Sequence, residues 1–448
     1  MSQSPSSPAA PAKHPTDVHG KALAINLDGT RYGTFAEIGA GQEVARWFLR
    51  VGAASGTVAQ TISAYDKTFS DVTYGSGTRY VSRERLLAML DYEYGLLDKR
   101  LGSTRGAQTR FFVFADTIAA RNFKGDNEQH GWLGIRFQEQ PGRKTSDILI
   151  HVNLMDPSAQ LQQEAIGLLG VNLIYAACYQ LASSWNGFLA GLFDELSIAR
   201  IELDVIELSG PSFANTDARL VCLQALRRGM THAIVFDPSG KVTEPSHVLR
   251  KRPLIVQRDR FETVEPYQPQ MLRASEAELK KEGILLGREP AAVLEMTIKD
   301  AWGEAAPGDE SLLLRRVEQI CTLGTVVVSD FPLPYLLIDY LRRHTTEPIR
   351  MVVGVATLAQ ILHDRFYTAL AGGLLEGVGK LLAANVKVYA YPVSADRFQQ
   401  AMAGTGDNAI TGESAEKLVT ADDILPAPPA DHFYRYLRAA DWIRPLSS

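Results

Sequence analysis

The sequence predicts an α/β protein with a mixed sheet in its N-terminal half and a mainly parallel, helix-covered sheet in its C-terminal half. In the C-terminal half, short and nearly uniformly apolar runs alternate with helix-like segments, as a parallel sheet covered on both faces requires. In the N-terminal half, three β-like runs follow one another with only polar, Gly- and Pro-containing loops between them. The composition, 46% hydrophobic and 22% charged, is that of a globular chain able to bury extensive cores.

The first half opens with an apolar run, a Gly-punctuated turn and an amphipathic segment at residues 21–51, which we interpret as strand, loop and helix. An amphipathic helix with Ser82 as its N-cap follows at residues 80–101. The remaining elements are β-like runs at 110–115, 132–137 and 147–152, helical sequence at 161–196, a strand from Ala199, and a helix at 217–229.

The second half alternates strands and helices most regularly. Its three clearest apolar runs, TVVVSD, RMVVGV and VKVYAYP, are joined by helical segments, and such crossovers connect parallel strands. We therefore expect these three runs to lie parallel in one sheet. The predicted strands are 231–238, 254–256, 291–298, 325–330, 350–355 and 386–392, and the predicted helices are 310–323, 334–344, 357–382 and 432–443.

A chain of 448 residues exceeds the usual size of one core, so we expect two domains. Residues 1–19 are rich in Ser, Pro and Ala and form a predicted disordered tail. The polar segment 258–289 separates the two halves and places a boundary near Glu276. The predicted domains are 20–275, with the candidate ligand site, and 276–448, with a C-terminal helix.

Composition and charge also exclude several classes of function. A net charge of −5, from 46 basic and 51 acidic residues, gives no general reason to bind nucleic acid or a membrane surface. No window approaches the roughly 18 to 20 consecutive apolar residues of a membrane span, and the N-terminus lacks the apolar run of a secretory signal. Cys178, Cys222 and Cys321 are widely spaced, as is typical of reduced thiols in a cytoplasmic protein. Small molecules and other copies of the chain are the expected partners.

The junction EIGAGQEVARWF carries the main candidate binding site. Gly39 and Gly41 precede a helix whose first amides could approach a phosphate or carboxylate, with Gln42 and Arg46 assisting. The alternative is a tight turn or close packing without a ligand. Glu37 and the neighbouring Glu43 would repel a bound phosphate unless a divalent cation such as Mg²⁺ intervened, and they could equally cap the helix.

The preceding segment NLDGT resembles the first motif of haloacid-dehalogenase-type phosphatases. Asp28 matches the acid–base aspartate of that motif, and Ser329 in TVVVSD could imitate its second motif. Asn26 occupies the nucleophile position, where an amide cannot form the aspartyl-phosphate intermediate of that family. The alternative for this segment is an ordinary Asp-Gly turn.

Other polar residues stand at the ends of apolar strands. Asp116 and Asp330 occupy such ends, where open α/β sheets place ligand-binding groups, although aspartates there also cap helices or bind turn amides. His130 could act as an acid, a base or a metal ligand. No second His or Cys lies at a familiar metal-binding spacing from it, so a satisfied or surface histidine is the alternative.

The segments ALAINLDGTRYGTFAEIGAGQEVARWF, FFVFADT, HGWLGIRFQ and DILIHV resemble a family of bacterial cytosolic proteins. Members of that family carry two different labels, nicotinate-nucleotide adenylyltransferase and TonB-dependent receptor. The first label implies an HxGH-type motif, which does not occur among these nine histidines. The second implies export and many alternating barrel strands, a pattern that this sequence lacks. The resemblance therefore implies a bacterial cytosolic protein and leaves its activity open.

Together these patterns predict a cytosolic protein that binds a nucleotide or another phosphorylated metabolite. It could be a metal-assisted phosphoryl- or nucleotidyl-transfer enzyme, with Asp28, Glu37 and Asp116 binding the ion or moving a proton. The alternative is a non-catalytic assembly or regulatory protein with a ligand pocket. Catalysis requires that the titratable groups converge on one pocket, whereas an assembly role predicts an exposed apolar patch.

Overall fold

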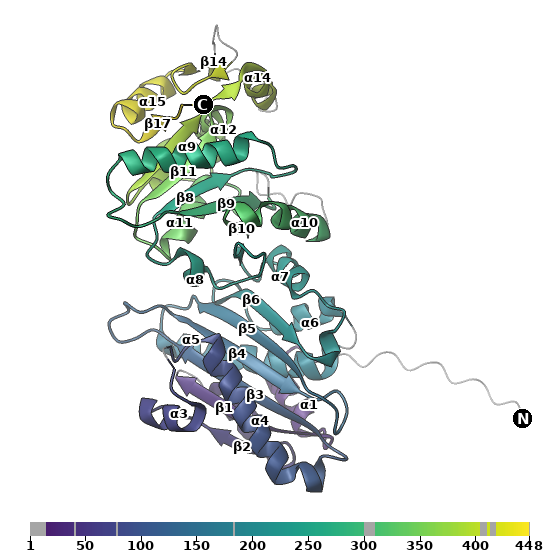
Figure 1. Ribbon diagram of the computed structural model, residues 1–448. Helices are drawn as coiled ribbons and strands as arrows, with labels where there is room; N and C mark the ends of the chain where they lie inside the picture. Colours follow the sequence, from purple (N-terminus) through teal and green to yellow (C-terminus); the bar gives the residue numbers. More distant parts are fainter. Residues whose placement is uncertain are drawn as a thin grey trace, which may run out of the picture. The chain divides into compact units, whose positions relative to one another are not determined.

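The computed structural model describes residues 15–39, 42–77, 79–181, 184–299, 310–403, 410–412 and 418–447. The chain divides into two compact units between Val221 and Cys222, and each unit contains one large sheet (Figure 1). The predicted α/β class is therefore confirmed.

The first unit contains strands β1 (Arg31–Gly39), β2 (Val58–Ile62), β3 (Arg110–Ala119), β4 (His130–Phe137), β5 (Ser146–Leu154) and β6 (Ile201–Ser209). They form one sheet in the order β2-β1-β3-β4-β5-β6. β1 pairs in parallel with β2 and β3, whereas β3 to β6 pair antiparallel. The three predicted β-like runs are β3, β4 and β5, and the predicted mixed sheet is confirmed.

The helices of this unit are α1 (Val18–Asn26), α2 (Glu43–Val51), α3 (Lys67–Tyr74), α4 (Arg83–Arg105), α5 (Ala159–Tyr175), α6 (Trp185–Leu192) and α7 (Ala218–Arg227), which crosses the division. Helices α4 and α5 cover opposite faces of the sheet (Figure 1). A Cβ on Gly134 in β4 would touch Leu86 and Leu90 of α4, whereas a Cβ on Gly170 in α5 would touch Phe114 of β3. Gly134 pairs with the residue after Phe114, and successive strand residues point to opposite faces.

The start of this unit differs from the prediction. Residues 18–26 form helix α1 rather than a strand, and the first strand is β1, which we expected to be loop. The buried positions of α1 have helical spacing, but two of them are polar. Lys21 is fully buried and donates to Asn172 and Asp194, and Asn26 donates to two backbone carbonyls. These polar residues obscured the apolar periodicity of the helix.

The predicted tail of residues 1–19 is also too long. Residues 1–14 lie outside the described residues, but Asp17 caps α1 through a hydrogen bond to the amide of Gly20. Val18, the first residue of the helix, is 5% exposed. The ordered unit thus includes residues that we assigned to the tail.

The second unit contains strands β7 (Ala233–Phe236), β8 (Leu254–Arg258), β9 (Ala291–Thr297), β10 (Thr325–Ser329), β11 (Ile349–Gly354), β12 (Val386–Tyr391) and β17 (Ile443–Pro445). Their order is β17-β12-β11-β8-β9-β10-β7, and every pair is parallel except β7 with β10. The predicted parallel arrangement of TVVVSD, RMVVGV and VKVYAYP is confirmed. The chain adds strands on one side of β8 and then on the other, as in doubly wound sheets.

Helices cover both faces of this sheet. They are α8 (Pro245–Leu249), α9 (Tyr267–Lys281), α10 (Glu310–Ile320), α11 (Pro334–Arg342), α12 (Val355–Ile361), α13 (Gly373–Leu382), α14 (Ala395–Ala403) and α15 (Ala430–Ala439). Val256 of β8 belongs to one buried cluster with Leu337 of α11, whereas its neighbour Ile255 belongs to another with Leu279 of α9. The alternation along one strand therefore separates two hydrophobic layers.

The division between the units lies well before the boundary that we expected near residue 276. Strands β7 and β8, which we assigned to the first domain, pair within the second sheet. Part of the predicted loop at 403–431 forms two small antiparallel pairs. These join β13 (Val393–Ser394) with β15 (Leu418–Val419), and β14 (Ile410–Gly412) with β16 (Ile424–Pro426).

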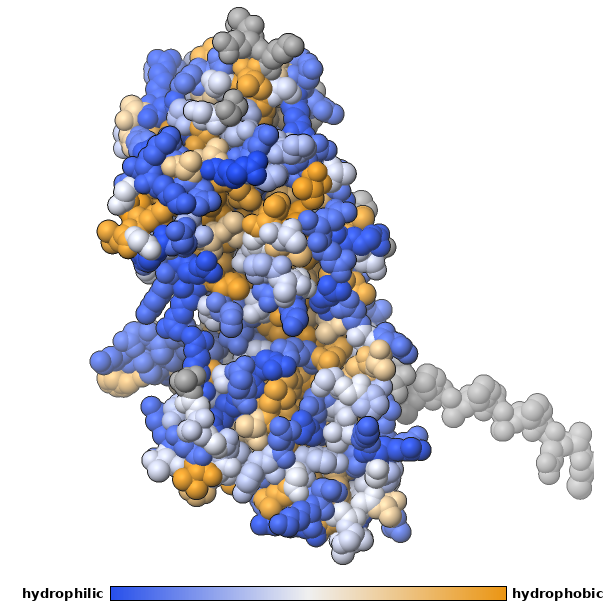
Figure 2. All heavy atoms as spheres, in the orientation of Figure 1, coloured by the Kyte–Doolittle hydropathy of each residue, from blue (hydrophilic) through white to orange (hydrophobic). Residues whose placement is uncertain are grey.

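Among the described helices, none combines the length and the apolarity needed to cross a bilayer. No disulfide joins Cys178, Cys222 and Cys321, all of which the structure describes. On the face shown in Figure 2, hydrophobic side chains interrupt a mostly hydrophilic surface at separate places in both units. Large exposed hydrophobic residues such as Val72, Phe123 and Leu286 belong to different segments of the chain.

Candidate functional site

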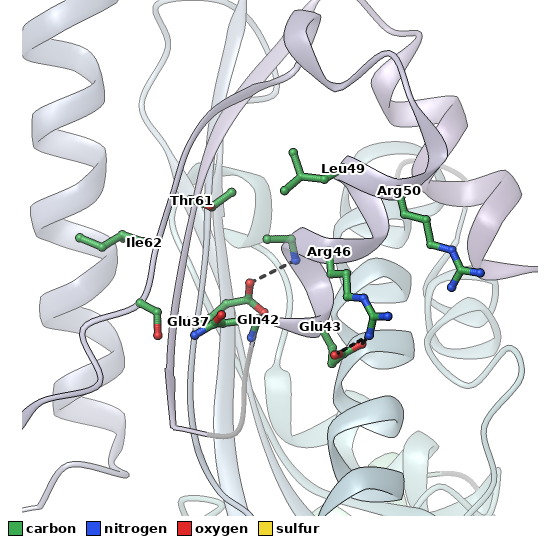
Figure 3. A pocket seen from close by; sticks show the side chains of 10 residues that line it. Glu37, Gln42, Glu43, Arg46, Leu49, Arg50, Thr61 and Ile62 are labelled. Carbon is green, nitrogen blue, oxygen red and sulfur yellow. Dashed lines mark hydrogen bonds and ion pairs between the residues drawn. The ribbon is translucent and has the colours of Figure 1, made fainter.

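The predicted junction after β1 borders a cavity of about 580 Å³, a size suited to a small ligand. Its walls come from the end of β1, from α2 along most of its length and from the end of β2 (Figure 3). Gln42, at the N-cap of α2, has a left-handed φ of 87°. Gly41 lies outside the described residues. The cavity is lined by Glu37, Gln42, Glu43, Ala45, Arg46, Leu49, Arg50, Thr61, Ile62 and Ser63.

Glu37 occupies the helix N-terminus that we expected to bind an anion. Its carboxylate accepts hydrogen bonds from the amides of Gln42 (2.8 Å), Val44 (3.1 Å) and Ala45 (3.1 Å). These amides are the donors that a phosphate would need, so a ligand phosphate there would have to displace a buried carboxylate. Burial raises the pKa of Glu37 to about 6, against the opposing effect of the three amide hydrogen bonds.

Arg46, the other charged residue of the predicted site, pairs with Glu43. Its guanidinium Nη1 lies 3.0 Å from the Glu43 carboxylate, and its side chain is 65% exposed (Figure 3). Such a surface pair stabilises the fold by at most about 1 kcal/mol, so a ligand could compete for Arg46 at little cost.

Gly39 fits the close-packing alternative. Its φ is +87°, and an added Cβ would lie 2.1 Å from the carbonyl oxygen of Ile118 in β3. Only glycine satisfies both constraints. The glycine therefore lets β1 approach β3 at its carboxyl end, and no ligand is needed to explain it.

Asp116 lies beside Glu37, because the two residues pair in the parallel ladder of β1 and β3. Asp116 is fully buried. Burial and the charge of Glu37 raise its pKa well above the ordinary value, against the opposing effect of a hydrogen bond from the Ile38 backbone. Both influences disfavour the ionised form of Asp116, which does not line the cavity.

Asp28 is remote from both acids, because it precedes β1 whereas Glu37 stands near the end of that strand, about 20 Å further along. Its carboxylate accepts bonds from Thr30, Arg31 and Tyr179. Burial would raise the pKa of Asp28, but these hydrogen bonds and the charge of Arg31 lower it. The three predicted catalytic acids thus do not converge.

The resemblance to haloacid-dehalogenase-type phosphatases fails for a structural reason. In that family the first motif follows a strand, whereas Asn26 ends helix α1. Asp28 accepts bonds from the amide and the hydroxyl of Thr30, which is the geometry of the Asp-Gly turn that we gave as the alternative.

A second polar cluster lies in the second unit, at the carboxyl ends of β9 and β10. Asp330 follows β10, and its two oxygens bind His232 Nδ1 and Lys299 Nζ, each at 2.9 Å. Lys299 stands two residues after β9, and His232 directly precedes β7. Burial would raise the pKa of Asp330, but the hydrogen bonds and charges of His232 and Lys299 lower it, so this aspartate is ionised.

This cluster stands at one end of a cavity of about 380 Å³. One wall is a face of α11 with helical spacing, formed by Leu336, Asp339, Tyr340 and Arg343. Phe331 and Pro332 complete the lining, and the ring of Phe331 stacks on His232 with centroids 5.8 Å apart. The cavity therefore combines cationic groups and two carboxylates, those of Asp330 and Asp339, with apolar and aromatic walls.

A buried network positions Asp330. Ser329 donates a short hydrogen bond to Glu295 in the neighbouring strand β9. Arg258, at the end of β8, lies 3.4 Å from the same Glu295 carboxylate and donates to the carbonyl of Phe331 at 2.6 Å. Burial raises the pKa of Glu295. These contacts fix the backbone on both sides of Asp330.

Sequence reasoning identified Asp330 as a strand-end candidate but missed His232 and Lys299. His232 reaches Asp330 because β7 pairs antiparallel with β10, so the amide of Asp330 donates to the carbonyl of His232 at 3.0 Å. The available signal was that His232 stands near the start of the predicted strand 231–238 and that Lys299 directly follows the predicted strand 291–298. Sequence order alone does not reveal which strand ends are neighbours.

No protein-family model matches this chain, and no curated protein matches its sequence. The crystal structure of competence/damage inducible protein CihA from Agrobacterium tumefaciens is similar at 18% identity and a TM-score of 0.21, over 31% of this chain and 81% of that one. A CinA superfamily competence-damaged protein from Enterobacter cloacae is similar at 10% identity and a TM-score of 0.28, over 40% and 98%. Similarity at this level identifies neither a family nor an activity.

Proposed function

We propose that this protein is a cytosolic α/β protein that binds a nucleotide or another phosphorylated metabolite in the cavity beside α11. The observation that carries this proposal is the gathering of His232 and Lys299 around Asp330 at the carboxyl edge of a mainly parallel sheet. Ligands of open α/β sheets bind at this edge. Three described cysteines that form no disulfide suit a reducing compartment.

The lining of the cavity suits a molecule with an anionic end and a flat apolar part. Lys299, His232 and Arg343 offer cationic donors, and one of them, Lys299, keeps 33% of its side chain exposed while bound to Asp330. Phe331 and Tyr340 offer aromatic faces against which a base could stack. A phosphate at the cationic end would gain charge-assisted hydrogen bonds.

His232 is the residue best suited to proton transfer in this cavity. Asp330 holds Nδ1, so Nε2 is the ring atom through which His232 would exchange a proton with a ligand. This role distinguishes an enzyme from a regulatory protein that only binds the ligand. His232→Gln should abolish turnover of a bound substrate in the first case and leave the response to ligand largely intact in the second.

Binding can be tested by calorimetry and thermal shift with ATP, ADP, AMP and sugar phosphates, each with and without Mg²⁺, and with the unphosphorylated nucleoside as the reference. We expect Lys299→Met to weaken binding of the phosphorylated compounds by about tenfold or more, because a charge-assisted hydrogen bond is lost. Lys281→Met is the matched control, since Lys281 lies in the same unit, is 72% exposed and pairs with Glu278.

The same experiment distinguishes ligand binding in this cavity from ligand binding at the junction of the first unit. Arg46→Met should leave affinity unchanged. If Arg46→Met weakens binding while Lys299→Met does not, the ligand occupies the junction and the proposal is wrong. Binding of the nucleoside as tightly as the nucleotide would likewise contradict the role given to Lys299.

A further inference from the structure

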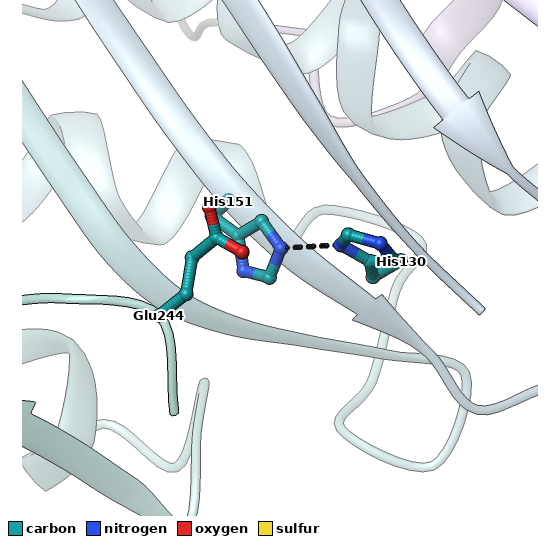
Figure 4. A group of neighbouring side chains, drawn as sticks. All are labelled: His130, His151 and Glu244. Carbon is teal, nitrogen blue, oxygen red and sulfur yellow. Dashed lines mark hydrogen bonds between the residues drawn. The ribbon is translucent and has the colours of Figure 1, made fainter. Parts of the chain in front are cut away.

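Three neighbouring strands of the first unit bring together a chain of polar side chains. His130 of β4 and His151 of β5 are joined by a contact of 2.9 Å between His130 Nδ1 and His151 Nε2 (Figure 4). On its other side, His151 Nδ1 lies 2.6 Å from Asp204 of β6. Asn153 donates to the second oxygen of Asp204 at 2.8 Å. His151 and Asp204 are each 2% exposed, and His130 is half-buried.

The contact with Asp204 fixes the state of the His151 ring. A carboxylate accepts hydrogen bonds, so Nδ1 of His151 carries the proton and Nε2 of the neutral ring carries a lone pair. The nitrogen with this lone pair lies 2.9 Å from Nδ1 of His130. Two ring nitrogens at this distance repel each other unless they share a proton or both bind one cation.

The spacing also suits two ligands of one metal ion. Zinc–nitrogen bonds are about 2.0–2.1 Å long, so two imidazole nitrogens on one ion lie about 2.9–3.4 Å apart in octahedral or tetrahedral geometry. A carboxylate that receives the second ring proton is the usual means of orienting a metal-binding histidine. Imidazole nitrogen favours Zn²⁺ and neighbouring transition metals over Mg²⁺.

We propose that His130 and His151 form a binding site for a divalent transition metal ion of the Zn²⁺ type. His130 binds through Nδ1 and His151 through Nε2, and Asp204 acts as a positioning residue by holding His151. Water completes the coordination of the ion. This site is in the first unit and does not depend on the function proposed for the cavity beside α11.

The test uses the full chain, freed of metal by chelation and titrated with Zn²⁺ by calorimetry and with Co²⁺ by visible absorption. We expect one site whose Co²⁺ spectrum shows nitrogen ligation and whose affinity falls as pH is lowered, because protons compete for the ring nitrogens. His130→Ala should weaken binding by about tenfold or more, and Asp204→Asn by about 10- to 100-fold. His432→Ala, whose side chain is 77% exposed, is the control and should bind normally.

Because His151 and Asp204 are buried, their variants could unfold, whereas His130 is half-buried and His130→Ala should fold. Zn²⁺ should raise the melting temperature of the wild type and not that of His130→Ala. Failure of the wild type to take up Zn²⁺ or Co²⁺ would overturn the proposal and leave a proton shared between the rings. Unchanged affinity in a folded His130→Ala variant would overturn it as well.

Discussion

Glu37 and Asp330 are buried carboxylates near the carboxyl ends of parallel strands, yet they have opposite surroundings. Glu37 accepts three backbone amides of the helix that follows its strand, whereas Asp330 binds the side chains of His232 and Lys299. Burial raises the pKa of Glu37 to about 6, but the two cationic partners lower that of Asp330.

The difference shows that an acidic residue near the carboxyl end of a strand can either occupy a potential binding site itself or help to form one. Glu37 satisfies the amides that a ligand would use and so completes the fold. Asp330 instead holds two titratable side chains at the end of a cavity, where 43% of the His232 side chain and 33% of the Lys299 side chain remain exposed. The partners of a carboxylate, rather than its position alone, indicate its role.

The largest expected effect concerns the glycines that end β1 and β11. Gly39→Ala should destabilise the protein by about 3–5 kcal/mol, because it combines an unfavourable positive φ with a collision against the Ile118 carbonyl. Gly354 also ends a strand directly before a helix, but its φ is −66°. Gly354→Ala should therefore change stability by no more than about 1 kcal/mol. Denaturant unfolding of both variants measures the contrast, and equal losses would show that the junction is not strained.

A smaller effect should separate the two carboxylates themselves. Glu37→Ala removes the acceptor for three amides at the buried end of α2 and should cost about 2–3 kcal/mol. Asp330→Ala should cost about 1 kcal/mol, since water can solvate the exposed parts of His232 and Lys299. Glu37→Gln keeps one side-chain acceptor and is the control. Chemical denaturation that ranks Asp330→Ala as the more damaging change would reverse our assignment of the structural role.

The smallest effect is the pH dependence of stability. The folded pKa of Glu37 lies above its ordinary value of 4.5, so its contribution is present below pH 4.5 and is lost as pH rises toward about 6, by about 2 kcal/mol. Asp330 has a lowered pKa, so its contribution is present at neutral pH and is lost as pH falls below 3.8. Asp116→Asn should reduce the loss of stability at higher pH, because burial and the charge of Glu37 raise the pKa of Asp116 as well and an amide has no proton to lose. An unchanged pH profile in this variant would show that Asp116 does not contribute to this loss.

The sequence predicted regular elements well where burial produced a simple pattern. TVVVSD and RMVVGV are buried along nearly their whole length, because helices cover both faces of their sheet. The uniformly apolar sequence of these runs is a direct consequence of this burial. The prediction of a strand in the region of helix α1 was wrong, because Lys21 and Asn26 occupy buried positions through specific hydrogen bonds. The hydrophobic periodicity of the sequence does not reveal buried polar residues of this kind.

The candidate sites were predicted less well, because they depend on strand pairing. His130 was recognised as a candidate, but its neighbour His151 is 21 residues away and comes alongside only through the pairing of β4 with β5. Asp330 was recognised in the same way, and its partners stand directly before β7 and two residues after β9. Composition and spacing in the sequence identify candidate residues of suitable chemistry. The order and register of the strands determine which of these residues lie next to one another.

The two edge strands of the second sheet, β7 and β17, affect how this protein could self-associate. They contain four and three residues, and β17 ends in Pro445, which has no amide hydrogen to offer. Short edge strands, one of them ending in proline, give another chain few backbone groups to pair with, which limits β-aggregation through this sheet. Any self-association of the second unit should therefore depend on side-chain contacts across its helices rather than on a continuous intermolecular sheet.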